Sequence, residues 1–96
     1  MDTQTYKHIK ITNKDWEFVE DDEGNEGIVG LHVDGEILES GTEFKVVVGF
    51  VDEEEIVTDV IFYQRNPVVS YEALKELCTL CEEATKEFKK EVGIND

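Results

Sequence analysis

The chain has 96 residues, of which 40% are apolar and 34% charged, and its formal net charge is −15 at pH 7. This length supplies one modest hydrophobic core, so we expect a single domain over residues 1–96. The apolar content excludes a disordered acidic tail, no apolar run reaches the roughly 20 residues of a membrane span, and the first residues lack a signal-peptide pattern. A cytoplasmic location, in the source cell or in a host, is therefore expected.

Negative charge is concentrated in one segment. Between residues 15 and 59 lie sixteen of the 24 acids but only one of the nine bases, so this segment alone carries a charge of −15. Dense negative charge repels nucleic acid and anionic lipid and attracts basic surfaces. The sequence therefore argues against direct binding to nucleic acid or membranes and predicts a protein partner with a basic surface.

The sheet is expected to lie within residues 5–64 and to consist of successive hairpins. The first hairpin joins strands at residues 5–12 and 15–21 through Asn13-Lys14, which we interpret as a two-residue turn. In this arrangement apolar and oppositely charged side chains meet across the two strands.

A polar loop at residues 20–27 precedes the second expected hairpin. Asp34-Gly35 is the strongest short turn signal in the chain, because a type I′ turn needs positive φ at both central positions. It predicts paired strands at residues 28–33 and 36–39.

The central hairpin occupies residues 44–64 and is the most apolar part of the chain. A register that pairs Val46 with Val60 keeps one face apolar and turns Asp59 outward, whereas a shift by one residue would set Asp59 opposite Val48 on the apolar face. The first register is therefore expected. It leaves these apolar side chains on the other face: Val47, Val51, Val57, Ile61 and Tyr63.

The C-terminal part predicts one helix over residues 70–92. Ser70 is placed as its N-cap and Gly93 as its end. The expected buried stripe consists of Tyr71, Leu74, Leu77, Cys78, Cys81, Ala84, Thr85, Phe88 and Val92. The expected fold is therefore α+β, with a mainly antiparallel sheet of about six strands and one C-terminal helix packed on one face.

Cys78 and Cys81 form a Cys-x-x-Cys pair within the expected helix. A redox pair usually lies at a helix N-terminus, where the dipole lowers the thiol pKa, so core packing is the better interpretation. His8 and His32 lie on separate expected strands, whereas zinc ligands usually come in two close pairs. We therefore expect no metal and no cofactor.

No catalytic pattern is found. Ser40 and Ser70 have no histidine or aspartate beside them in the sequence, and the glycines form no phosphate-binding motif. The acids at residues 20–26 lack the ligand spacing and the flanking helices of an EF-hand. The sequence predicts a protein that is not an enzyme.

The candidate binding residues are acidic and apolar. The acidic set is Asp21, Asp22, Glu23, Glu26, Asp52, Glu53, Glu54, Glu55 and Asp59, with Glu36, Glu39 and Glu43 on neighbouring strands. Held on a rigid sheet, such carboxylates can imitate a phosphate backbone. The simpler interpretation is that they only keep the chain soluble, but a charge this far from zero costs stability through self-repulsion, which favours a use for it.

In size, acidity and α+β make-up, the chain resembles phage-encoded inhibitors of host defence, including DNA-mimic, anti-restriction and anti-CRISPR proteins. The resemblance covers composition and size, and it assigns no residue. It implies an inhibitor that occupies the basic surface of a host nucleic-acid-binding or defence protein. The alternative is a homo-oligomeric or structural assembly module, for example a homodimer, built on the apolar residues Val47, Val57, Ile61 and Tyr63.

Overall fold

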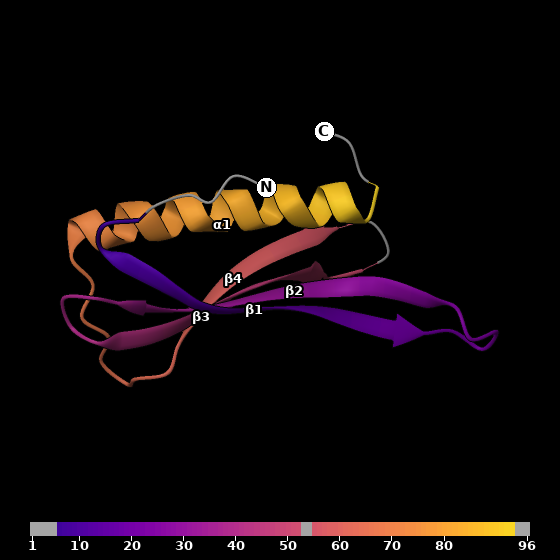
Figure 1. Cartoon of the computed structure of the whole chain (residues 1–96), viewed down its shortest axis with the longest axis horizontal. Helices are drawn as coiled ribbons and strands as arrows, with labels where there is room; N and C mark the ends of the chain where they lie inside the picture. The colour runs from indigo at the N-terminus through magenta and orange to yellow at the C-terminus, as the bar shows by residue number, and fades with distance from the viewer. Residues whose placement is uncertain (1–5, 53–54, 94–96) are drawn as a thin grey trace.

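The computed structural model describes residues 6–52 and 55–93 (Figure 1). This part of the chain comprises β1 (Ile9–Glu20), β2 (Glu26–Ile37), β3 (Thr42–Phe50), β4 (Ile56–Phe62) and α1 (Tyr71–Glu91). The strands form one antiparallel sheet in the order β1-β2-β3-β4, and α1 lies across one of its faces. The α+β class is confirmed, but the sheet has four strands instead of the expected six.

The first expected hairpin is wrong, because Asn13 and Lys14 lie inside the continuous strand β1. A β-bulge shifts the register between Ile11 and Asn13, so that Thr12 has no partner in the ladder. The bulge interrupts the alternation of apolar and polar residues, and in the sequence this interruption looks like a turn. Beyond the bulge, Lys14 forms an ion pair with Glu87 of α1.

The second expected turn, Asp34-Gly35, is also wrong, because β2 runs straight through it. Gly35 does not have positive φ. It faces Phe44 across the sheet, where an added Cβ would lie 2.3 Å from the Phe44 Cζ atom and 2.8 Å from the Lys10 carbonyl oxygen. Glycine is therefore needed here to make room for an aromatic ring and not to make a turn.

The remaining connections and the central hairpin follow the predictions more closely. Gly24 and Gly41 have φ values of 85° and 72° in the turns after β1 and β2. In the central hairpin Val46 pairs with Val60, and Asp59 is exposed opposite Val47, so the predicted register is confirmed. One regular hairpin therefore connects the buried β3 with the edge strand β4.

The limits of the helix are set by local interactions. The Ser70 hydroxyl accepts a hydrogen bond of 3.1 Å from the Ala73 backbone N–H, which confirms the N-cap. At the other end Gly93 has a φ of 80°, as expected for a residue that ends a helix. The described helix is not apolar enough to cross a membrane.

The buried stripe of α1 is rotated relative to the prediction. It consists of Ala73, Leu77, Leu80, Ala84 and Phe88. The prediction was wrong for Tyr71, Leu74 and Cys78, all of which are exposed. Because this helix carries apolar residues on more than one side, only its contact with the sheet decides which side is buried.

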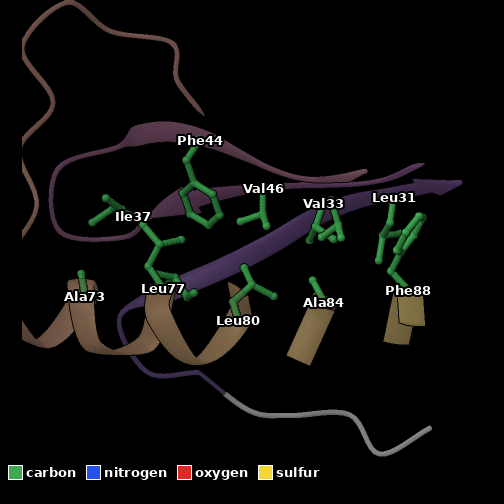
Figure 2. Close-up of a cluster of buried hydrophobic side chains, with 12 residues drawn as sticks. Leu31, Val33, Ile37, Phe44, Val46, Ala73, Leu77, Leu80, Ala84 and Phe88 are labelled. Atoms are coloured by element: carbon green, nitrogen blue, oxygen red, sulfur yellow. The ribbon is translucent and has the colours of Figure 1, made fainter. Parts of the chain in front are cut away.

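The core lies between α1 and the two central strands (Figure 2). β2 contributes Leu31, Val33 and Ile37, and β3 contributes Phe44, Val46 and Val48. Near the C-terminal end of α1 the rings of Phe50 and Phe88 meet edge to face, with centroids 5.3 Å apart. Among the described residues, no helix covers the opposite face of the sheet (Figure 1).

Candidate functional site

The outer face is the surface of the sheet that points away from α1. Its side chains alternate along each strand with those of the core. The cross-strand register arranges them in four rows: Lys10, Glu36, Glu43 and Tyr63; Asn13, Asp34, Lys45 and Ile61; Asp15, His32, Val47 and Asp59; and Glu17, Gly30, Gly49 and Val57.

The outer face has two chemically different halves. The β1–β2 half is mainly acidic and polar, whereas the β3–β4 half brings together all four predicted apolar residues. Val47 and Val57 are half-buried, and the side chains of Ile61 and Tyr63 are 48% and 55% exposed. An apolar strip therefore lies beside a carboxylate-rich one on the same rigid surface.

Asp34 links the two halves. Its carboxylate accepts a hydrogen bond of 3.2 Å from the Tyr63 hydroxyl and lies 3.9 Å from the Lys45 ammonium nitrogen. Farther along the face, the His32 ring lies 3.2 Å from a carboxylate oxygen of Glu17. These contacts hold several of the charged side chains in defined positions.

Two like charges face each other in the first row of the outer face. Glu36 is the direct cross-strand partner of Glu43, and Lys10 is its partner on the other side. Like charges opposite each other on an antiparallel pair are destabilising. Beside them is an open hollow of about 250 Å³, lined by Thr12, Asn13, Asp34, Gly35, Glu36, Glu43, Phe44 and Tyr63.

The predicted loop acids lie at one end of the molecule. Because the sheet is a meander, the β1–β2 tip and the β3–β4 tip point in the same direction (Figure 1). The exposed acids here are Asp21, Asp22, Glu23 and Glu26 on the first tip and Asp52 and Glu55 on the second. Glu53 and Glu54 lie outside the described residues, and Asp59 lies apart from both tips, within β4 on the outer face.

Aspartate side chains accept backbone hydrogen bonds in the described part of both tips. The Asp21 carboxylate accepts hydrogen bonds of 2.9 Å from the backbone N–H groups of Asn25 and Glu23. These bonds hold the pKa of Asp21 below its ordinary value, and the bond from Asn25 has the larger effect. On the other tip, the Asp52 carboxylate accepts a 3.0 Å bond from the Glu55 N–H. Both acids therefore help to hold the described backbone on either side of these connections.

At the end of the molecule where the acidic tips lie, α1 carries basic residues. Its last turn carries Lys89 and Lys90. Negative charge is therefore concentrated on the sheet and its tips, and not evenly over the molecule.

The two cysteines differ in their surroundings, and both are free thiols. Cys78 is exposed, so the core-packing prediction was wrong for this residue, whereas Cys81 is half-buried against the core. Burial, with the neighbouring Cys78 and Glu82, raises the pKa of Cys81 and keeps its thiol protonated. Among the described residues, no group of three or more His, Cys, Asp or Glu side chains is placed to hold a metal ion.

Ser40 and Ser70 make hydrogen bonds that stabilise the fold. Ser40 donates a hydrogen bond of 2.9 Å to the Val68 carbonyl oxygen, and Ser70 caps α1. Glu39 lies between Ser70 and His8, at 3.3 Å and 3.0 Å. A hydrolytic triad needs the reverse arrangement, with the histidine between the serine and the acid.

Some acids of the outer face were missed in the sequence. Asp15, Glu17 and Asp34 were assigned to hairpins that do not form, so their common face was not recognised. In the sequence, the signal for their common face was that they alternate with the apolar residues Trp16 and Val33.

No known protein family matches the chain, and no curated protein or solved structure shows a significant similarity to it.

Proposed function

We propose that this chain is a small acidic binding protein, without catalytic activity, that occupies a basic surface of a partner protein. The observation that best supports this function is the placement of the carboxylates. The described ones lie on the outer face and on two tips at one end of the same sheet, where Asp21 and Asp52 accept backbone hydrogen bonds. Side chains fixed in this way can match a basic surface with little loss of conformational entropy.

The Glu36–Glu43 pair adds support. These side chains face each other across β2 and β3, an arrangement that lowers stability. Solubility needs negative charge but does not need it at two opposed positions. A basic partner would relieve this repulsion on binding, because it would place positive charge between the two carboxylates.

The finer form of this proposal concerns the partner. Proteins that bind nucleic acid carry basic surfaces that recognise a regular array of phosphates. A rigid array of carboxylates can occupy such a surface, so the chain would act as a phage-type inhibitor and nucleic-acid mimic against a host nucleic-acid-binding or defence protein in the cytoplasm. This finer form of the proposal is supported by the negative charge and the small size of the chain.

The test compares two charge-neutralised variants. The first changes the outer face by Asp15→Asn, Glu36→Gln, Glu43→Gln and Asp59→Asn. The second removes the same charge from exposed helix positions by Glu72→Gln, Glu82→Gln, Glu83→Gln and Glu91→Gln. Each immobilised chain is exposed to host lysate at about 50 and 300 mM salt, where electrostatic binding should differ strongly, and retained proteins are identified by mass spectrometry.

We expect the unaltered chain and the helix variant to retain the same basic proteins at low salt, and the outer-face variant to lose them. An oligonucleotide should compete if the retained protein normally binds nucleic acid. Binding that is unchanged by salt would contradict the proposal, as would equal losses in both variants, because it depends on the position of the charge.

A second candidate is a homo-oligomeric assembly module. The observation that favours it is the apolar half of the outer face, where Ile61 and Tyr63 are about half exposed beside Val47 and Val57. Sedimentation over a range of concentrations distinguishes the two candidates. A dimer that Ile61→Lys dissociates supports this one, and a strict monomer at high concentration contradicts it.

A further inference from the structure

The two edges of the sheet differ in how they resist pairing with another strand. β1 carries five charged residues among twelve and has a bulge at Thr12. β4 has the sequence Ile-Val-Thr-Asp-Val-Ile-Phe, with one charged residue and a regular register along its whole length. Charges and bulges on an edge strand hinder the addition of another strand, so β1 is protected and β4 is open.

The free hydrogen-bonding groups of β4 can be assigned from its ladder. The Tyr63 N–H donates a bond of 3.1 Å to the Glu43 carbonyl oxygen of the strand beside it. Because hydrogen-bonded pairs alternate along an antiparallel ladder, every second residue of β4 bonds to β3, and the residues between them point their N–H and C=O groups to the free edge. In the part of the chain that the structure describes, no strand pairs with this edge, so the residues with free groups are Ile56, Thr58, Val60 and Phe62.

The side of α1 that lies next to β4 at Thr85 carries apolar side chains toward the helix N-terminus. The Thr58 and Thr85 hydroxyls are hydrogen-bonded, which places α1 beside β4. Cys81, Cys78 and Leu74 follow on the same side of the helix, at spacings of three or four residues toward its N-terminus. Cys78 is exposed and the Leu74 side chain is 47% exposed.

A strand added to β4 would therefore find different surroundings on its two sides. Its side chains on the inner side would lie next to Val60 and Phe62, which pack against the core, and next to the apolar side of α1. Its side chains on the outer side would lie next to Asp59, which is exposed, and Ile61. Such a site favours a segment in which apolar and charged residues alternate.

Charge decides between a second copy and a different partner. Two-fold antiparallel pairing about the middle of β4 would set Asp59 against Asp59 of a second copy, and each chain has a net charge of −15. Glu55, directly before β4, and Glu43, beside Tyr63, add negative charge along the outer side. The nearby base Lys45 already lies 3.9 Å from Asp34. These charges favour lysine or arginine on the outer side of an added strand.

We propose that the edge of β4 and the adjoining side of α1 form a strand-addition site for an extended segment of a partner protein, with apolar residues on its inner side and basic residues on its outer side. This inference rests on the proposed function, since both require a basic partner. It adds that backbone hydrogen bonds to β4, and not charge alone, hold that partner.

The test uses a defined peptide and the full chain labelled with ¹⁵N. The peptide is an acetylated and amidated heptamer of alternating lysine and valine, and its control is the same heptamer with every backbone amide N-methylated. The control keeps the charge and the side chains but cannot donate hydrogen bonds to a strand edge. We expect the parent peptide to slow amide exchange at Ile56, Thr58, Val60 and Phe62, and the control to bind at least about tenfold more weakly.

Two variants make the test independent of the peptide chemistry. Thr58→Pro removes a free-edge N–H, and Thr58→Val removes the same hydroxyl but keeps that N–H. We expect Thr58→Pro to weaken binding of the parent peptide at least about tenfold and Thr58→Val to change it by less than about threefold. The exchange measurement on the unaltered chain decides the question if Thr58→Pro does not fold.

The other outcomes overturn the inference in distinguishable ways. Equal, salt-sensitive binding of both peptides would exclude strand addition and leave the proposed acidic surface in place. If neither peptide binds, the β4 site is wrong, and the lysate experiment with the outer-face variant still decides the proposed function. Slow exchange at the same four amides without peptide, together with a dimer in sedimentation, would assign the edge to a second copy.

Discussion

The two faces of this sheet are made by the same strands but have opposite environments. In β3, the inner residues Phe44 and Val46 are fully buried under α1, whereas Glu43, Lys45 and Val47 alternate with them on the outer face. Burial makes the inner face the main source of stability. The outer face points away from α1, so it tolerates opposed carboxylates, which would disrupt a core, and apolar side chains that stay half exposed.

The largest expected difference between the faces concerns a buried ring. Phe44→Ala should lower the free energy of unfolding by about 3–5 kcal/mol, because it removes a fully buried aromatic side chain and leaves a cavity. Ile61→Ala on the outer face should lower it by less than about 1 kcal/mol, since about half of that side chain is already exposed. Urea unfolding measures both values. Similar losses would mean that the outer face is covered in solution.

The next largest effect on the free energy of unfolding is expected when a methyl group is added beside the Phe44 ring. Gly35→Ala should lower the free energy of unfolding by about 1–3 kcal/mol, because the new Cβ would lie 2.3 Å from the Phe44 ring. Gly27→Ala in the same strand is the control, since nothing lies within 4 Å of its added Cβ, and its effect should stay within about 0.5 kcal/mol. If Gly35→Ala is neutral, the close approach of Phe44 to β2 is not present in solution.

A smaller effect of opposite sign is expected on the outer face. Glu43→Gln should raise the free energy of unfolding by about 0.2–1 kcal/mol at low salt, because it removes the repulsion from Glu36. The gain should fall in about 1 M salt, where the Debye length is roughly 3 Å. Thermal unfolding of Asp22→Asn, which removes one charge from the β1–β2 tip, is the control. An equal gain there would assign the effect to net charge instead of to this pair.

The smallest expected effect is confined to the β1–β2 tip. Hydrogen bonds from Asn25 and Glu23 lower the pKa of Asp21, so its charged form stabilises the folded tip. This contribution is present above the ordinary aspartate pKa and is lost as the pH falls through the lowered pKa of the folded state.

Amide exchange and chemical shifts of Glu23 and Asn25 during an acid titration measure this loss. Asp21→Asn should remove the transition at the tip and leave the amides of the core strands unchanged. A transition that extends into β2 and β3 would show that the tip and the core unfold together.

Features of the fold that depend on interactions between residues close in the sequence were easier to predict than features that depend on distant residues. The start of α1 at Ser70, its end at Gly93 and the pairing of Val46 with Val60 could be predicted, because a cap, a left-handed glycine and a period of two are local signals. The turn signals at Asn13-Lys14 and Asp34-Gly35 are just as local, but long-range pairing of β1 with β2 overrides them.

The candidate site was predictable in its composition but not in its arrangement. The acids of both tips and the apolar residues of β3 and β4 were identified from the sequence, and those that the structure describes lie at one end and on one face, in agreement with the sheet order. Asp15, Glu17 and Asp34 were missed on this face, because their position depends on which strands β1 and β2 pair with. The exposed side of α1 at Leu74 and Cys78 was missed because an apolar pattern alone does not show how a helix is rotated on its sheet.

The sequence by itself determined the chemistry of this protein: an apolar central hairpin, a capped C-terminal helix and a charge of −15 confined to the strands and their loops. These properties depend on residue type and short-range spacing. Only the tertiary structure decided that the described residues form a four-stranded sheet, that Gly35 accommodates the ring of Phe44, and that β4 is an edge strand of this sheet beside an exposed side of α1. Those features depend on contacts between residues that are distant in the chain, and local propensity does not encode them.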